Sequence, residues 1–287
     1  MRTAFIGTSA FAATVLEALA GSPHRPQLVL TRPARPRGRG RHVSPTPVAQ
    51  ATAELGMTTL APERLGDAAE QLAAFAPDVV CVCAYGALVR EPILSSYEIL
   101  NVHPSLLPRW RGAAPVERAI IAGDEQTGVC IMRLVAELDA GPVCAVEATP
   151  IGTQDDYGAL AERLARIAGR LLVGALDGPR SYVEQAGEVT YAEKIGPEDR
   201  VLDPARSANE LERVVRALHP HIGAHTPGGL GVARARVAGE SVAAGELALV
   251  GGRLLYGVSG GSLELVRVKP PGGREMDGAA YARGHAI

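Results

Sequence analysis

Long apolar runs are missing from this sequence of 287 residues, although apolar residues make up 47% of it. A helix needs about 20 consecutive apolar residues to cross a bilayer, so the sequence excludes a helical membrane protein. The stretch from Met1 to Gly7 has one basic residue and a very short apolar run. It predicts a first β-strand and not a secretory signal. These absences predict a soluble globular protein of the cytoplasm.

Cysteine is also scarce, and the few cysteines do not form a pattern. All four lie inside apolar segments, at Cys81, Cys83, Cys130 and Cys144. Their spacing fits neither a zinc site nor a disulfide scaffold. We therefore expect buried free thiols, and we expect no metal site.

Charge of one sign is not in excess, because the formal net charge is −2. This value excludes a uniformly basic nucleic-acid coat and still allows a local basic patch. Lysine occurs only at Lys194 and Lys269, so nearly all basic residues are arginine. A dinucleotide-binding glycine fingerprint is lacking too, since Ser9 and Ala12 occupy the glycine positions that should follow Gly7. A nicotinamide-dependent enzyme is therefore disfavoured.

The first part of the chain alternates apolar strands with amphipathic helices. The expected strands are 3–6, 27–30, 78–84, 129–134 and 143–148, and the expected helices are 11–19, 47–55, 68–75, 115–121 and 156–176. The continuous apolar run 78–84 is typical of a central parallel strand that is covered on both faces. This alternation predicts an α/β fold with a Rossmann-like, mostly parallel sheet.

The pattern changes beyond Gly178. Ser207 is expected to cap a helix that ends at Leu218. After it come short apolar strands separated by glycine-rich turns, at 231–237, 247–255 and 263–268. Short strands with such turns predict a small closed β-barrel. We expect a first domain over 1–182, a linker over 183–203 and a barrel domain over 204–287.

Asn101 and His103 stand at the end of a short apolar strand, just before the proline-rich stretch 104–115. Because they are two residues apart, an extended backbone points both side chains to the same side. An amide donor and an imidazole in this position can serve a developing oxyanion, and the imidazole can also pass a proton. An isolated Asn-x-His pair is more often a polar strand end, so the specificity lies in the longer stretch.

Residues 31–42 contain five arginines interleaved with proline and glycine. Such a stretch cannot form the face of a helix. It is either a solvated loop without a partner or an arginine-rich loop that follows a phosphate backbone and orders on contact. The residues by themselves leave both interpretations open.

The stretch 101–115, Asn-Val-His-Pro-Ser-Leu-Leu-Pro-Arg-Trp-Arg-Gly-Ala-Ala-Pro, resembles the signature of the methionyl-tRNA formyltransferases. The resemblance runs from the first strand to the last residues, and 191–195 is similar to a linker signature of that family. It implies an enzyme that passes a formyl group from 10-formyltetrahydrofolate to the amino group of initiator methionyl-tRNA. It also implies a monomer that uses no metal, with an OB-like C-terminal domain that holds tRNA.

The resemblance implies roles for particular residues. Asn101 would hold the formyl oxygen, His103 would share the oxyanion as a donor, and Asp139 would receive the amine proton, directly or through water. The folate site is implied at Tyr85, Gly86, Ser105, Leu106, Leu107 and Pro108. Arg39 and Arg41 are implied to contact the acceptor arm of tRNA.

The sequence departs from the family pattern at three places. Pro104 stands where the family usually has glycine, and Ala140 replaces a threonine beside Asp139. The run 219–224, His-Pro-His-Ile-Gly-Ala, lacks the usual tryptophan of the C-terminal domain. The three catalytic residues are intact. The last departure bears on how the C-terminal domain contacts tRNA.

Three other functions use parts of the same pattern. A formyltransferase for an amino-sugar nucleotide or another small amine would need neither the arginine loop nor the added barrel. A non-catalytic RNA-binding protein on this scaffold would have no use for Asn101, His103 and Asp139 together. The same three residues argue against a folate-dependent hydrolase, in which water is the acceptor.

Overall fold

The computed structural model describes residues 1–37, 42–285 and 287. The described chain divides into two compact units, each built from three segments. Unit 1 comprises Met1–Ala113, Thr127–Thr149 and Ala161–Tyr191, and unit 2 comprises Ala114–Gln126, Pro150–Leu160 and Ala192–Ile287. Each unit therefore combines segments that are distant in sequence.

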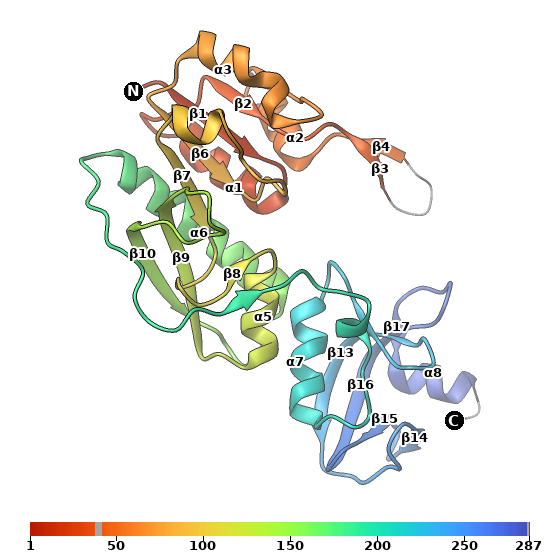
Figure 1. Cartoon of the computed structure of the whole chain (residues 1–287). Coiled ribbons are helices and arrows are strands. Elements are labelled where there is room, and N and C mark those ends of the chain that lie inside the picture. The colour runs from red at the N-terminus through yellow and green to blue at the C-terminus, as the bar shows by residue number, and fades with distance from the viewer. Residues whose placement is uncertain (38–41, 286) are drawn as a thin grey trace. The chain divides into compact units, whose positions relative to one another are not determined.

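A seven-stranded sheet with the order β10-β9-β7-β6-β1-β2-β5 forms the centre of unit 1 (Figure 1). Its strands are β1 Thr3–Gly7, β2 Leu28–Leu30, β5 Thr59–Leu60, β6 Val79–Cys83, β7 Ile99–His103, β9 Gln126–Arg133 and β10 Val143–Pro150. The neighbours from β5 to β7 are parallel, and β9 is antiparallel to β7. The predicted mostly parallel, Rossmann-like sheet is confirmed.

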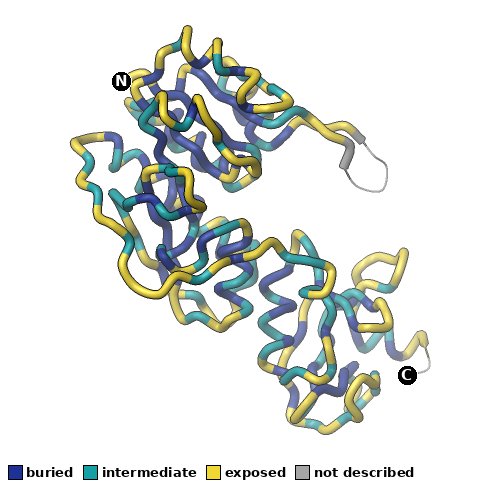
Figure 2. The backbone as a smooth tube through the Cα atoms, in the orientation of Figure 1, coloured by how far each residue is buried: buried dark blue, intermediate teal, exposed yellow. Residues whose placement is uncertain are grey.

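The central strands β1 and β6 are buried at every residue. Figure 2 shows them as dark blue segments inside unit 1. Burial on both faces is the reason why these strands are continuous apolar runs in the sequence. The polar candidates Asn101 and His103 lie instead on the neighbouring strand β7, in its middle and at its carboxyl end.

Helices accompany the parallel strands of unit 1. They are α1 Ala10–Ala20, α2 Pro47–Glu54, α3 Ala69–Phe75, α4 Ile93–Ser96, the larger part of α6 Tyr157–Leu176, and the 3₁₀ turn η1 Leu65–Ala68. Ser9 caps α1 by accepting a hydrogen bond from the backbone N–H of Ala12, and Thr46 caps α2 in the same way. The start of each of these two helices is therefore fixed by local sequence.

The two ends of the arginine-rich stretch form strands that pair with each other. β3 (Arg35–Arg37) is antiparallel to β4 (His42–Ser44). Arg35 donates a hydrogen bond to Glu63 at 3.1 Å, and both side chains are mostly exposed. Arg39 and Arg41, the predicted tRNA contacts, lie outside the described residues.

Unit 2 contains an antiparallel sheet of six strands, on a path β12-β13-β16-β15-β14 with β17 paired to β16. The strands are β12 Ala224–His225, β13 Gly231–Ala238, β14 Leu247–Val250, β15 Arg253–Val258, β16 Gly261–Lys269 and β17 Met276–Asp277. The helices are α5 Pro115–Ala122, α7 Ala208–Leu218, α8 Gly278–Gly284 and the 3₁₀ turn η2 Glu198–Arg200. A C-terminal antiparallel domain is thus confirmed, while closure into an OB-like barrel stays a prediction.

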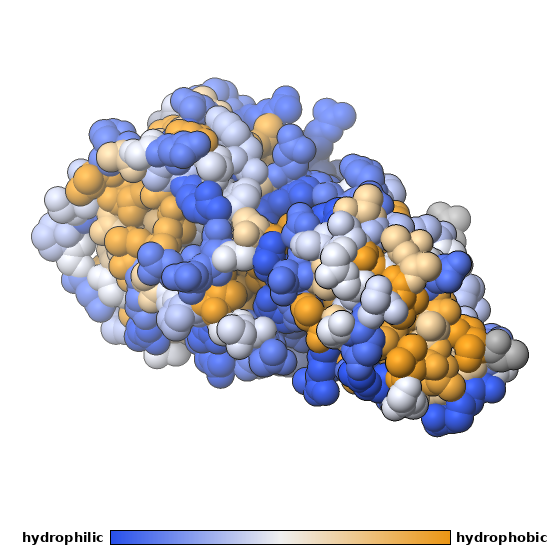
Figure 3. Space-filling view, turned by 90° about the horizontal axis from the view of Figure 1, so that it is seen from below, coloured by the Kyte–Doolittle hydropathy of each residue, from blue (hydrophilic) through white to orange (hydrophobic). Residues whose placement is uncertain are grey.

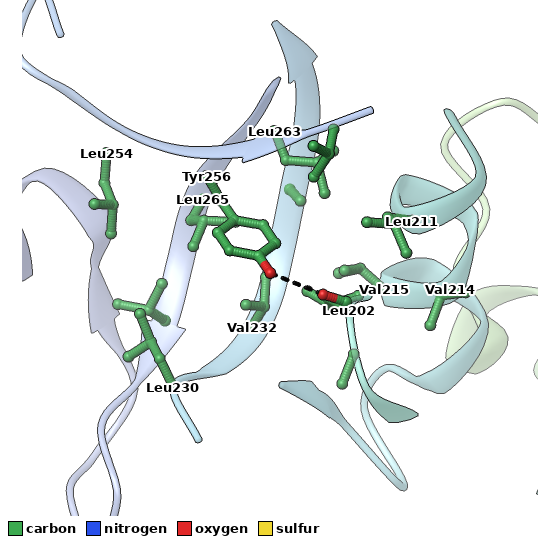
Figure 4. Packing of buried hydrophobic residues seen from close by; sticks show 14 of the residues in the cluster. Leu202, Leu211, Val214, Val215, Leu230, Val232, Leu254, Tyr256, Leu263 and Leu265 are labelled. Atoms are coloured by element: carbon green, nitrogen blue, oxygen red, sulfur yellow. Dashed lines mark hydrogen bonds between the residues drawn. The ribbon is translucent and has the colours of Figure 1, made fainter. Parts of the chain in front are cut away.

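The core of unit 2 lies between this sheet and α7. Leu211, Val214 and Val215 of α7 are almost fully buried in one apolar cluster with the sheet residues (Figure 4). The Tyr256 hydroxyl enters this cluster and donates to the carbonyl of Leu202 at 3.0 Å. A buried tyrosine needs such a partner, so this bond removes the cost of burying its polar end.

Ser207 caps α7 as predicted. Its hydroxyl accepts a hydrogen bond from the N–H of Glu210, and the Glu210 carboxylate accepts one from the N–H of Ser207. The two bonds form a capping box. The helix begins where the sequence predicts because this cap is entirely local.

His219 and His221, in the run that departs from the family pattern, each contact a carboxylate of unit 2. His219 Nδ1 is 2.8 Å from Asp156 Oδ2, and His221 Nε2 is 2.9 Å from Glu117 Oε1. The His221 ring also stacks on the ring of Tyr157, with centroids 3.6 Å apart. A stacked histidine therefore stands in the run that lacks the usual tryptophan.

The surface of the molecule is mixed in character. The space-filling view shows hydrophilic residues over most of one face, with separate apolar patches among them (Figure 3). Among the described residues, no helix has the length and apolar character that a membrane span requires.

Candidate active site

Asn101 and His103 point toward one carboxylate. Both lie on β7, where buried Val102 separates them. Asn101 Nδ2 donates to Asp139 Oδ1 at 3.3 Å, and His103 Nδ1 lies 3.6 Å from Asp139 Oδ2. The structure therefore brings together the three residues that the sequence predicts as catalytic, although Asp139 is distant in the chain.

Asp139 occupies a tight turn after β9. Its φ is +47°, in the left-handed region that aspartate tolerates better than most residues. It is buried, and its Oδ2 also accepts a hydrogen bond from the backbone N–H of Gly112 at 2.9 Å. A carboxylate with two oxygens can accept from several donors at once, so Asp139 is the point where three segments meet.

The hydrogen bonding of His103 identifies the nitrogen that remains for chemistry. His103 Nε2 is 2.8 Å from the carbonyl oxygen of Trp110. A carbonyl only accepts, so Nε2 must carry the hydrogen. Nδ1 faces Asp139 at 3.6 Å, which is longer than a hydrogen bond. Nδ1 is thus the nitrogen available to a reacting group.

The loop after His103 is held by its own polar groups. Ser105 is fully buried, and its hydroxyl donates to the carbonyl of Arg109 at 2.6 Å. Leu106 and Leu107 are half-buried, and Pro108 is buried. Of the predicted folate wall, the side chains of Leu106 and Leu107 are therefore the ones with surface left for a ligand, while Ser105 braces the loop.

Tyr85 and Gly86 lie at the switch point of the sheet. In the sheet, β2 lies on one side of β1 and β6 lies on the other, so the strand order reverses at β1. In folds of this kind, ligands bind beyond the carboxyl ends of the two strands at such a reversal, here β1 and β6. Thr8 donates to the carbonyl of Tyr85 at 3.0 Å, and Arg32 donates to the carbonyl of Gly86 at 3.0 Å. Burial raises the pKa of Tyr85. The predicted folate positions thus occupy the usual ligand-binding edge.

Sequence reasoning missed several residues that surround Asp139. Gln185 donates to the carbonyls of Asp139 and Gly141, and Arg111 donates to Gln185. Thr190 accepts a hydrogen bond from the N–H of Trp110 at 2.9 Å. Arg111 lies in the signature stretch 101–115 but was given no role, whereas Gln185 and Thr190 lie in the stretch predicted as a linker, where no local signal pointed to the site.

No group of three or more metal-ligating side chains occurs among the residues that the structure describes. Desolvation raises the pKa of Cys81 to about 12 and that of Cys130 to about 11, and it also raises the pKa of Cys83. These thiols are therefore protonated at neutral pH and poor nucleophiles. The polar groups around Asp139 remain the candidate for chemistry.

Two family models match the chain. Residues 1–176 match a family described as formyl transferase, and residues 194–286 match its C-terminal domain. The methionyl-tRNA formyltransferase of Halorhodospira halophila is 44% identical over 300 aligned positions, which cover 100% of this chain and 97% of that protein. Both domains and their order are thus shared with a relative of almost the same length.

Solved structures share the fold. HypX from Aquifex aeolicus, in complex with tetrahydrofolic acid, superimposes with a TM-score of 0.67 at 17% identity, covering 98% of this chain and 47% of HypX. An N-formyltransferase from Helicobacter canadensis, in complex with folinic acid and dTDP-3-aminofucose, has a TM-score of 0.68 at 13% identity, covering 92% of this chain and 98% of that one. At such low identity these likenesses establish the fold alone.

Proposed function

The chain belongs to the formyl transferase family, among the methionyl-tRNA formyltransferases, and we propose that it formylates the amino group of initiator methionyl-tRNA. The donor is folate-derived, and we propose 10-formyltetrahydrofolate. The observation that carries the proposal is the meeting of Asn101, His103 and Asp139 at one carboxylate in a chain that matches its relative from end to end.

The reaction forms a bond between the amine nitrogen and the formyl carbon and breaks the bond from that carbon to the folate nitrogen. Asn101 donates one amide hydrogen to Asp139 and keeps the second for the formyl oxygen, which gains negative charge during attack. His103 Nδ1 faces the same region, and when protonated it donates to that oxygen or passes a proton to the leaving nitrogen.

Asp139 receives the proton that the amine loses, directly or through water. Its carboxylate is buried and already accepts from Asn101 and Gly112, and these donors hold it in one orientation. A proton acceptor that is held in place close to the amine raises the rate, because the two groups do not have to find the right geometry by diffusion. The trio therefore supplies the oxyanion donors and the proton acceptor that the transfer needs.

The acceptor tRNA requires a basic surface, and we place one on unit 2. Arg234 and Arg236 are exposed on β13, and Lys269 is exposed at the end of β16. Arg234 lies directly opposite Arg267 across the strand pair, and of these two Arg267 has a carboxylate partner in Glu275 at 2.9 Å. Arg236 lies opposite Glu264, so the basic character of this strand rests on the exposed guanidinium groups of Arg234 and Arg236 themselves, which can contact a phosphate backbone.

We propose that Arg39 and Arg41 add phosphate contacts from the arginine-rich stretch. We also propose that residues 1–182 bind folate and catalyse, that 183–203 link the domains, and that 204–287 hold tRNA. A monomeric state and a place in the cytoplasm, where translation begins, stay predictions. Sedimentation of the purified protein tests the first of them.

The decisive test is a formyl-transfer assay with the full-length protein and 10-formyltetrahydrofolate. Charged initiator tRNA, charged elongator tRNA and a nucleotide-linked amino sugar are offered side by side, and an Asp139→Asn variant with strongly reduced but measurable activity serves as the control. We expect rapid formylation of the initiator tRNA alone. Preferential transfer to the amino sugar would replace the proposal with the small-amine alternative, and transfer to no acceptor would overturn it.

A further inference from the structure

The turn that carries Asp139 is not held by apolar burial. Residues 136–138 are exposed, with Leu138 at 47% of its full exposure. Asp139 and Gly141 are the buried members of the turn, and neither contributes an apolar side chain. A segment with so few buried apolar contacts opens easily, so the position of the carboxylate depends on polar contacts to the turn.

Gln185 makes such contacts from a distant part of the chain. Its Nε2 donates to the carbonyl oxygen of Asp139 at 2.7 Å and to that of Gly141 at 2.8 Å, so one amide group spans the turn. On its other side the turn lies against the backbone of β9, since a Cβ atom at Gly141 would lie 1.8 Å from the carbonyl oxygen of Arg133. The turn is thus held between β9 and Gln185.

The opposite end of the same amide faces Arg111. Gln185 Oε1 accepts from Arg111 Nε at 3.1 Å and from Arg111 Nη2 at 2.8 Å, while Arg111 Nη1 donates to Glu137 of the turn at 3.2 Å. Arg111 is buried, and the N–H of the next residue, Gly112, donates to Asp139 Oδ2. A closed ring therefore runs from the Asp139 carboxylate through Gly112, Arg111 and Gln185 back to the Asp139 carbonyl.

The chemistry of this ring calls for an amide. A guanidinium only donates and a backbone carbonyl only accepts, so the side chain between them must accept at one end and donate at the other. Glutamate at 185 would place a carboxylate against two carbonyl oxygens. A hydrocarbon or thioether side chain would take the amide away from Arg111 and from both carbonyls, which is costly for buried groups.

We propose that Gln185 is a positioning residue that sets the Asp139 carboxylate for formyl transfer, an inference that rests on the proposed function. A displacement of about 1 Å at a reacting group costs on the order of 100-fold in rate. The hydrogen bonds that the structure gives Gln185 go to Asp139, Gly141 and Arg111, all outside the proposed folate and tRNA positions. Its loss should therefore lower kcat and leave both KM values unchanged.

The first test is Gln185→Met in the full-length protein, which keeps the approximate volume and removes both polar ends. We expect kcat to fall about 10- to 100-fold, with unchanged KM for folate and for tRNA. The matched control is Gln154→Met, because Gln154 is exposed in a turn and donates to its neighbour Thr153. The control should keep the parent kinetics. An unchanged kcat in Gln185→Met would overturn the proposal, as would a rise in KM alone.

A double-mutant cycle separates positioning from general damage. If Gln185 acts through Asp139, then Gln185→Met should cost less than about twofold in an Asp139→Asn background. Multiplied losses would show that Gln185 acts elsewhere and would overturn the proposal. If Gln185→Met does not fold, Gln185→Glu replaces it, with the same expected loss of kcat.

Hydrogen–deuterium exchange gives a readout that does not need activity. The amides of residues 136–141 should exchange faster in Gln185→Met than in the parent, while those in Gln154→Met should not change. If the parent protein formylates no tRNA, the proposed function fails, yet faster exchange would still support the role of Gln185 in holding the turn. Equal exchange in parent and variant would overturn that role.

Discussion

In unit 1 the central strands β1 and β6 are buried at every residue, whereas in unit 2 the strand β13 alternates buried residues with exposed arginines. A parallel sheet covered on both faces leaves little room for polar side chains, and the polar candidates of unit 1 lie on β7, in its middle and at its carboxyl end. On β13 of unit 2, by contrast, Arg234 and Arg236 are exposed on either side of buried Ala235, so this strand keeps one side for polar contacts. Unit 1 thus offers a confined site that suits a small reacting group, and unit 2 offers an exposed basic strand that suits a large polyanion.

The two units also differ in how their site residues are assembled. Asn101 and His103 are two residues apart on one strand, yet both face Asp139 of another segment, and Asp139 in turn is bonded by Gly112 and Gln185. The basic residues of β13 and β16 are placed by strand pairing and alternation alone. Catalysis in unit 1 should therefore be sensitive to single changes, and binding by unit 2 should tolerate them better.

The largest effect should follow from removing an oxyanion donor in unit 1. Asn101→Ala should lower kcat on the order of 100- to 1000-fold, as the loss of one such donor does elsewhere. Folate binding, measured by calorimetry with a folate analogue, should be retained because the proposed wall lies at other residues. His103→Ala and Asp139→Ala should be similarly inactive. A variant of any of the three with parent turnover would remove that residue from the mechanism.

A smaller effect of a different kind is expected on the sheet of unit 2. The pair Arg234→Ala and Arg236→Ala should raise the KM for tRNA roughly tenfold and make the slope of log affinity against log salt shallower by about 2, with kcat unchanged. Kinetics across a salt series provide the measurement. The matched control is the pair Arg166→Ala and Arg170→Ala on α6, whose mostly exposed side chains form ion pairs with glutamates, and it should change nothing.

The Arg39→Ala, Arg41→Ala pair should act like the unit 2 pair, with a higher KM for tRNA and unchanged folate binding. If neither pair changes the salt dependence, phosphate contacts lie elsewhere and the two units do not divide the work as proposed. If the salt dependence changes only in the variant at Arg39 and Arg41, the basic face of unit 2 is not part of the tRNA site.

A third prediction compares one ion pair in each unit. Arg180 bonds both oxygens of Glu98, at 3.0 and 2.5 Å, and Arg118 bonds both oxygens of Asp199, at 2.8 and 2.9 Å. These arginines lower the pKa of Glu98 below its usual 4.5 and that of Asp199 below its usual 3.8. Glu98→Gln and Asp199→Asn should each lower the free energy of unfolding by about 1 to 2 kcal/mol at pH 7.

The pH dependence of these losses has a definite sign. A carboxyl whose pKa is lower in the folded state stabilises the protein above its unfolded pKa and loses that contribution as the pH falls through the folded value. The difference between parent and Glu98→Gln should therefore be constant at neutral pH and shrink below pH 4.5, the usual value for that group. Urea unfolding at several pH values measures it. A difference that grows in acid would contradict the assignment.

The smallest expected effect concerns the thiols. Burial raises the pKa values of all four thiols, but only Cys81, Cys83 and Cys130 are buried as predicted, because Cys144 is half-buried. Iodoacetamide in mildly alkaline buffer should label Cys144 slowly and the other three hardly at all, without loss of activity. Mass spectrometry of digests identifies the labelled sites, and protein unfolded in urea should be labelled at all four. Rapid labelling of native Cys81 would show that the core of unit 1 opens.

The elements with local signals were predictable from the sequence. The apolar run at 78–84 became β6, and Ser207 caps α7 with Glu210 three residues later. The arginine-rich stretch shows the limit of such reasoning. Its composition predicts a loop, yet 35–37 and 42–44 pair as strands, because backbone pairing depends on the partner strand as much as on propensity.

Periodicity and capping act over a few residues, and they were enough to predict the apolar strands and the helix caps, whereas the family and the candidate Asp139 came from the resemblance of the sequence to a known family. How Asp139 is held became visible only in the folded chain. Gln185 reaches Asp139 across 46 residues and Arg111 across 74. No local pattern records such pairs. Their geometry exists only when the folded sheet brings the segments to one edge, and there a single amide meets two carbonyls and a guanidinium.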